Sequence, residues 1–287
     1  MIKNRWARRH VAEAIVKFLM LLSFVVVAAS LGLILWTIIS RGLPSLSWSM
    51  ITQIPKGGYY MGKEGGVLNA IIGSLYLAGG GTLLALVFSL PIALYLNTYL
   101  GDSQWGQYVR LSLDVLWGIP SIVYGAFGFA LMLELGMRAS LLAGIVVLGL
   151  LELPIMVRAM DEVIRRMPVD LEQAAFALGS TKLEVAVRVV TRQMLPGIVT
   201  AILLAFGRGI GDAASVLFTA GYTDRIPTSL LRPTASLPLA VFFQLSTPYP
   251  EVQRRGYASA LILTVVVLVI SLGSRWMSNR FNRYTVK

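Results

Sequence analysis

The sequence has no cysteine and a single histidine, His10, among its 287 residues. The lack of cysteine excludes disulfides and thiol chemistry, and a zinc site that needs several His or Cys ligands is not expected. We therefore expect no metal, no cofactor and no catalytic residue. Charge is also scarce, because Asp, Glu, Lys and Arg make up only 14 % of the chain, against about 25 % in ordinary globular proteins.

Hydrophobic residues make up 56 % of the chain, and the mean hydropathy is +0.72. This composition is typical of a polytopic helical membrane protein, and no stretch is long enough and polar enough to form a soluble domain. The predicted fold class is an all-α membrane protein with six transmembrane helices. The predicted spans cover about residues 14–39, 68–98, 111–134, 139–158, 196–221 and 256–274. Gly and Pro are dense over 117–125, which predicts either an interrupted helix or tight packing there.

The net charge of +11 is explained by orientation in the membrane, not by nucleic acid, because Lys and Arg cluster at the ends of the predicted spans. Sixteen of the 25 Lys and Arg residues fall on the side that holds the basic flank 1–13, the segment 159–195 and the tail 276–287. The bias predicts that both termini and this segment are cytoplasmic. Arg254 and Arg255 weaken the bias, since they flank the sixth span on the opposite side.

One apparent motif is misleading. Gly57, Gly62 and Lys63 match the phosphate-loop pattern G-x-x-x-x-G-K, but Glu64 stands where that loop needs Ser or Thr for magnesium. No strand is predicted before it. We therefore expect that any ATP is bound by another chain.

The segment between the fourth and fifth spans is predicted to form a helix, a corner and a second helix. Asp170 with Gln173, and Thr181 with Glu184, have the spacing of capping boxes that begin helices. Gly179 between them suits a helix end or a sharp bend. From the residues alone, a loop resting on lipid headgroups and a loop that contacts another protein are both open.

Gln173-Ala174-Ala175 followed by Gly179 resembles the EAA loop of ABC importer permeases, which docks on the ATPase subunit. Four further segments resemble phosphate permeases of the PstA type, in the same order along the chain. They are residues 66–74, 117–128, 153–158 and 207–214. The EAA pattern alone is weak, but the linked segments together are specific.

The resemblance implies a type I ABC importer permease (MetI-like) fold in the bacterial cytoplasmic membrane, with a permease domain over 65–275 after a first helix at 14–39. It implies ATPase coupling through a loop at about 159–195. The residues expected to make that contact are Glu172, Gln173, Ala174, Ala175 and Gly179. The implied partners are a second, PstC-type permease, a pair of PstB-type ATP-binding subunits and an extracytoplasmic phosphate-binding protein. Inorganic phosphate is the implied cargo.

Two departures from the family pattern stand out. The motif's Glu is Gln173 here, with Glu172 one position earlier, so a charged contact to the ATPase is either lost or shifted. The acid that follows the intramembrane arginine is Asp212 instead of Glu, which shortens its reach by one methylene.

Arg208 and Asp212 are the most informative charges, because both lie inside the predicted fifth span. Charges at that depth are costly and usually face a bundle interior or a water-filled path. Their i, i+4 spacing places them on one helical face. Two interpretations are open: Arg208 attracts an oxyanion while Asp212 positions it, or the two form a structural ion pair. Asp114, Glu134 and Glu152 lie near predicted span ends, where wet or paired carboxylates are ordinary.

The predicted function is the permease subunit of an ATP-driven phosphate importer. Another oxyanion, such as sulfate or molybdate, is the alternative cargo. A membrane enzyme is disfavoured because the sequence offers no nucleophile or metal cluster, and a stand-alone transporter is disfavoured because no inverted repeat is evident.

Overall fold

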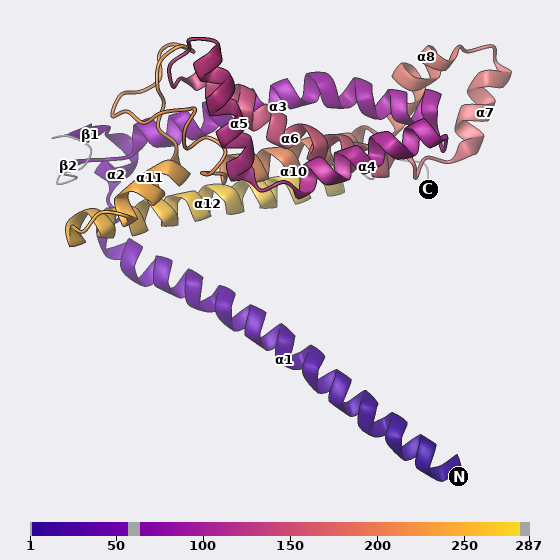
Figure 1. Ribbon diagram of the computed structural model, residues 1–287, viewed down its shortest axis with the longest axis horizontal. Helices are drawn as coiled ribbons and strands as arrows, with labels where there is room; N and C mark the ends of the chain where they lie inside the picture. Colours follow the sequence, from indigo (N-terminus) through magenta and orange to yellow (C-terminus); the bar gives the residue numbers. More distant parts are fainter. Residues whose placement is uncertain (1, 57–63, 282–287) are drawn as a thin grey trace.

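The computed structural model describes residues 2–56 and 64–281, and these are mostly helical. Figure 1 shows an elongated bundle, from which α1 (Ile2–Gly42) leaves at an angle. Four helices are each long and apolar enough to cross a membrane. The number rises to as many as six when each of two bent pairs, Gln104–Gly118 with Ser121–Glu134 and Lys182–Gln193 with Leu195–Ile210, is counted as one span. The six-span fold predicted from the sequence therefore agrees with the structure, while the form of two spans differs.

The centre of the bundle is the packing of α3 (Leu68–Tyr95) against α6 (Leu141–Ile164). Small buried residues on α3, such as Ala78 and Ala85, bring the two helices close together, and Met156 and Met160 of α6 are completely buried. Pro91 lies inside α3, which ends in the π-helical turn η2 (Leu96–Leu100). A Pro inside a helix removes one backbone hydrogen bond, so the helix continues here because neighbouring helices hold it.

The third predicted span is two helices, α4 (Gln104–Gly118) and α5 (Ser121–Glu134), which meet at 94°. Proline has no N–H and disfavours helical geometry in the residue before it. Ile119 accordingly has φ −69° and ψ 130°, and Pro120 is the N-cap of α5. Of the two alternatives predicted for 117–125, the interrupted helix is confirmed, and the helical region begins at Gln104 instead of near 111.

The fifth span is shorter than predicted. Helix α10 (Leu195–Ile210) ends at Ile210 instead of near 221. The turn that follows the helix is held by Asp212, whose carboxylate oxygen accepts a hydrogen bond of 2.8 Å from the backbone N–H of Ser215. The turns that follow are buried at Val216 and Ala220. This non-helical stretch is packed mainly against protein, although Gly211 and Phe218 are exposed. Irregular backbone at membrane depth is tolerated where it is buried in protein or lines a water-filled cavity.

Short elements close the end of the bundle opposite α7 (Val169–Ala177; Figure 1). They are η1 (Leu43–Ser45), α2 (Trp48–Thr52), α11 (Leu237–Leu245) and the antiparallel strands β1 (Pro55–Lys56) and β2 (Glu64–Gly65). The phosphate-loop-like residues Gly57, Gly62 and Lys63 lie outside the described residues. Helix α12 (Pro250–Phe281) extends the sixth span beyond residue 274, and it packs on α10 and α11.

Gly73 of α3 lies against the chain that leads into α11, and it yields a test of this packing. A Cβ atom at Gly73 would lie 1.9 Å from the backbone oxygen of Ala235, whereas one at Gly79 would meet nothing within 4 Å. We expect Gly73→Ala to destabilise the protein by about 1–3 kcal/mol, as overpacking does. Gly79→Ala, in the same helix, should be neutral or slightly stabilising. Thermal unfolding in detergent measures both, and equal midpoints for the two variants would contradict the packing described.

Candidate functional site: a charged cavity and the α7 loop

A cavity of about 700 Å³ lies between α10, α12, α6 and the α4 end. Its wall is mainly apolar, with charged and hydroxyl groups at a few positions. The lining residues are Trp117, Ile155, Thr200, Leu203, Leu204, Gly207, Arg208, Gly211, Asp212, Ser271 and Arg275. A mainly apolar hollow with a few convergent polar groups is the usual form of a small-ligand site.

The structure places both predicted pathway residues on this cavity, but it does not pair them. No ion pair joins Arg208 to Asp212 in the described part of the chain. The prediction that Arg208 and Asp212 share one helical face is wrong, because α10 ends at Ile210 and the Asp212 carboxylate caps the following turn. Of the two interpretations left open, the structural ion pair is therefore absent among the described residues. Arg208 is exposed at the surface of the single chain.

Arg275 is a lining residue that the sequence interpretation did not predict, because it was counted only as an orientation signal. It lies on α12 one turn beyond Ser271, and both line the cavity together with Thr200 of α10. The signal that could have found it is the i, i+4 spacing of a hydroxyl and a cation at the end of an apolar helix.

Glu152 was expected near the end of a span, and this expectation is wrong. It is in the middle of α6 and completely buried. One of its oxygens accepts a hydrogen bond of 2.7 Å from the Thr82 hydroxyl of α3. The other has no hydrogen-bond partner among the described residues and lies against Gly209 of α10, where a Cβ atom would clash at 1.9 Å.

The segment between α6 and α10, residues 165–194, is called the α7 loop, and it has the predicted helix–corner–helix form. It consists of α7 (Val169–Ala177), a corner at Gly179, α8 (Lys182–Glu184), the π-helical η3 (Val185–Val190) and α9 (Thr191–Gln193). Figure 1 shows α7 and α8 at the end of the bundle opposite β1 and β2. The corner is a Schellman motif: Gly179 has φ +85° and its N–H donates to Phe176 O, while Ser180 N–H donates to Ala175 O.

The two predicted capping boxes have different outcomes. The box of Thr181 with Glu184 is present, with reciprocal hydrogen bonds of 3.3 and 3.0 Å. The box of Asp170 with Gln173 is wrong, since Pro168 is the N-cap of α7 and provides no side-chain hydrogen bond. Asp170 instead lies in the first turn of α7, where the helix dipole stabilises a negative charge.

The residues expected to contact an ATPase lie on an accessible helix. Gln173, Ala174 and Gly179 are exposed, and Glu172 and Ala175 are partly buried. Leu178, at the end of α7, is 88 % exposed. A small-residue surface beside an exposed leucine suits close approach by another protein.

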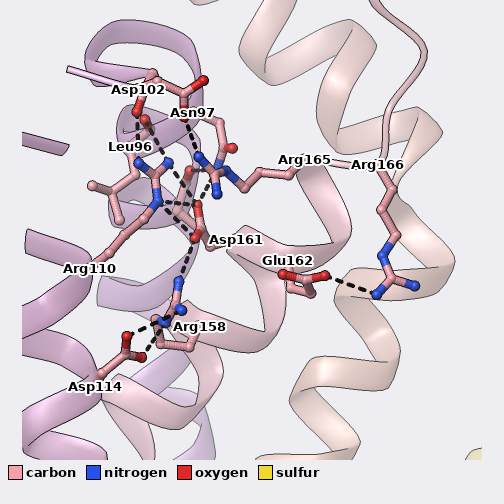
Figure 2. A network of polar contacts seen from close by, with 12 residues as sticks. Leu96, Asn97, Asp102, Arg110, Asp114, Arg158, Asp161, Glu162, Arg165 and Arg166 are labelled. Carbon is pink, nitrogen blue, oxygen red and sulfur yellow. Dashed lines mark hydrogen bonds and ion pairs between the residues drawn. The ribbon is translucent and has the colours of Figure 1, made fainter. Parts of the chain in front are cut away.

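A buried ion-pair network lies close to the end of α6 that leads into this loop (Figure 2). Asp161 of α6 is completely buried and is bonded by Arg110 of α4, Arg158 of α6 and Asn97 of η2. Arg158 also donates a hydrogen bond of 2.6 Å to Asp114 of α4. Sequence reasoning did not find the pairing of Arg110 with Asp161, because no local spacing relates residues on separate helices.

Comparison with known proteins identifies the family. Residues 89–286 match the family model of the binding-protein-dependent transport system inner membrane component. The phosphate transport system permease protein PstA 1 of Mycobacterium tuberculosis is 35 % identical over 282 residues, which cover 96 % of this chain and 91 % of that protein. PstA of Xylella fastidiosa is 37 % identical, and the match covers 83 % of each chain.

Solved structures agree on the fold. A chain of the MetNI methionine ABC transporter, in inward-facing conformations, superposes with a TM-score of 0.62 at 16 % identity. The match covers 75 % of this chain and 95 % of that one. This chain is therefore a multi-pass membrane transporter subunit, and it belongs to the binding-protein-dependent inner membrane components and, within them, to the PstA family of phosphate transport system permease proteins.

Proposed function

We propose that this chain is the permease subunit of an ATP-driven phosphate importer and forms half of the translocation pathway. The observation that carries the proposal is Arg208, an exposed cation on a membrane-spanning helix at the wall of a cavity. Its family relatives are named as phosphate transport permeases, which supports phosphate as the cargo.

The position of Arg208 supports contact with water instead of lipid. It is thirteen residues beyond the start of α10 at Leu195, which places it about 20 Å along the helix at 1.5 Å per residue. A charge at that depth costs about 3 kcal/mol on insertion scales when it faces lipid. We infer that a water-filled path, closed by a second permease, covers this face. A planar guanidinium is well suited to two oxygens of phosphate.

The α7 loop supports coupling to a separate ATPase. We propose that a pair of PstB-type subunits docks on α7, that a PstC-type chain supplies the other half of the pathway, and that a phosphate-binding protein delivers the anion at the β1–β2 end. Both termini and the α7 loop are then cytoplasmic. Closing of the ATPase pair would move α7 and switch the cavity between its two openings.

The first test is uptake of labelled phosphate by proteoliposomes that hold all subunits. Uptake should require ATP, and Arg208→Gln should lower it by about 10- to 100-fold, the effect of losing a charged hydrogen bond of about 1.5–3 kcal/mol. Arg208→Lys, which keeps the charge, should lose less. Arg138→Gln, which removes an exposed arginine from the turn between α5 and α6, is the matched control and should retain uptake.

Sulfate and molybdate, added in excess, distinguish the cargo. Neither should compete with labelled phosphate if the chain serves a phosphate importer. Strong competition by either would favour the alternative oxyanion, and uptake that persists without the ATPase would refute the coupling.

The second test concerns the surface of α7. Ala174→Trp should prevent co-purification with the ATPase, because a large ring on the exposed small-residue surface would block close docking. Ala12→Trp, an exposed alanine near the start of α1, is the control and should leave the complex intact. Stable assembly of the Ala174→Trp complex would count against α7 as the docking helix.

The third test separates the charge of Asp212 from its hydrogen bond. We expect Asp212→Asn to retain most of the thermal stability and uptake, since an amide oxygen can still accept from Ser215 N–H. Asp212→Ala should lower stability by about 1 kcal/mol, as lost caps do. If Asp212→Asn abolished uptake with unchanged stability, the carboxylate charge itself would be required.

A further inference from the structure

We propose that the ion-pair network centred on Asp161 transmits movement of α7 to the bundle. In this account the network locks the ends of α3, α4 and α6 into one rigid body, which α7 moves. The inference rests on the proposed function, because it gives that function its mechanical link.

The network joins three elements through one carboxylate. Asp161 receives hydrogen bonds from Arg110 at 3.0–3.2 Å, from Arg158 at 2.8 Å and from Asn97 at 2.9 Å. Both oxygens are bonded, and the side chain is completely inaccessible. Charges that are this deeply buried and fully bonded fix direction and distance more strictly than apolar contacts do.

Arg110 also holds the end of the α3–η2 helix. It donates a hydrogen bond of 2.7 Å to the carbonyl of Gly101 and one of 3.4 Å to that of Leu96. Gly101 follows the last residue of η2, so its carbonyl has no partner within the helix, and Arg110 supplies one while it pairs with Asp161 of α6. The Leu96 carbonyl already accepts from the Gly101 N–H at 2.9 Å, and Arg110 adds a second, longer hydrogen bond there. One residue of α4 therefore fixes α3 and α6 together (Figure 2).

The network lies where force from α7 would enter. Asp161 is three residues before the end of α6 at Ile164, and α7 begins at Val169. The link between the helices is short, and its Met167 is buried in the same core as Met160 and Ile164.

The other end of the loop returns to that core. Val185 and Val190 of η3 are buried and belong to the same cluster as Leu96 of η2. The α7 loop is thus anchored on both sides, and displacement of α7 acts on the body that the network holds together.

The alternative is that the network only stabilises the fold. In that case breaking it would lower assembly, hydrolysis and uptake together. A transmission role instead predicts that hydrolysis continues while transport is lost, since the ATPase can still dock and close but the bundle no longer follows.

The test measures phosphate transported per ATP hydrolysed in the reconstituted complex. We expect Arg110→Gln to keep hydrolysis within about twofold of wild type and to lower uptake about tenfold, within the usual range of coupling effects. Arg110→Lys should recover part of the uptake. Arg166→Gln removes an exposed pair with Glu162 close to the same helix end, and as the matched control it should keep the wild-type ratio.

A structural measurement separates transmission from stability. Because the chain has no cysteine, spin labels can be placed at Ser112→Cys on α4 and Glu162→Cys on α6, both exposed positions. The distance between the labels should be the same with and without ATP in the wild-type background. In the Arg110→Gln background it should change with ATP.

Two results would overturn the inference. One is a loss of hydrolysis and uptake in the same proportion in Arg110→Gln, and the other is a distance between the labels that responds to ATP in the same way with and without Arg110. Should Arg110→Gln not assemble, Asp114→Ala removes only the partly exposed acceptor of Arg158, and an unchanged ratio there would overturn the inference equally. A wild-type complex that hydrolyses ATP without phosphate uptake would instead refute the proposed function.

Discussion

The cost of an unpaired polar group inside a membrane-spanning bundle governs this structure. Asp161 is buried only because two arginines and an asparagine bond it. The irregular chain after Ile210 is tolerated because Asp212 caps it and it is packed mainly against protein. Departures from this rule include one oxygen of the buried Glu152, which has no hydrogen-bond partner among the described residues, and the charge of Arg208, which lies exposed on the surface of the single chain. The exposed Arg208 is the departure that bears on function. It indicates a face which is completed by water or by another chain.

The same constraint explains what could be predicted from the sequence. The length of the hydrophobic runs predicted six crossings. Glycine is the residue that most readily adopts a positive φ, so its presence at 179 predicted the corner that the structure shows. These features depend on residues that are close together in the chain. The starts of α7 and α8 were predicted with different success. Thr181 and Glu184 form the predicted capping box of α8, whereas the N-cap of α7 is Pro168 and not Asp170.

The remaining features depend on contacts between distant residues. Arg110 and Asp161 are 51 positions apart, and no periodicity relates them. The early end of α10 could not be read from hydropathy, because the buried turns that follow it are as apolar as a helix. Arg275 was hidden for a similar reason: a basic residue at a span end is first an orientation signal, and only packing of α12 on α10 brings it to the cavity.

We infer that water reaches the cavity face of α10 and α12, whereas lipid covers the surface of α1. A thiol reacts as its thiolate, which apolar surroundings disfavour. This chain has no native cysteine, so labelling read out on the separated chain reports the introduced cysteine alone. In the assembled complex, Thr200→Cys and Ser271→Cys should react with a water-soluble maleimide in at least one nucleotide state, while Ser30→Cys on exposed α1 should not. Failure of both cavity cysteines to react in every nucleotide state would contradict the account.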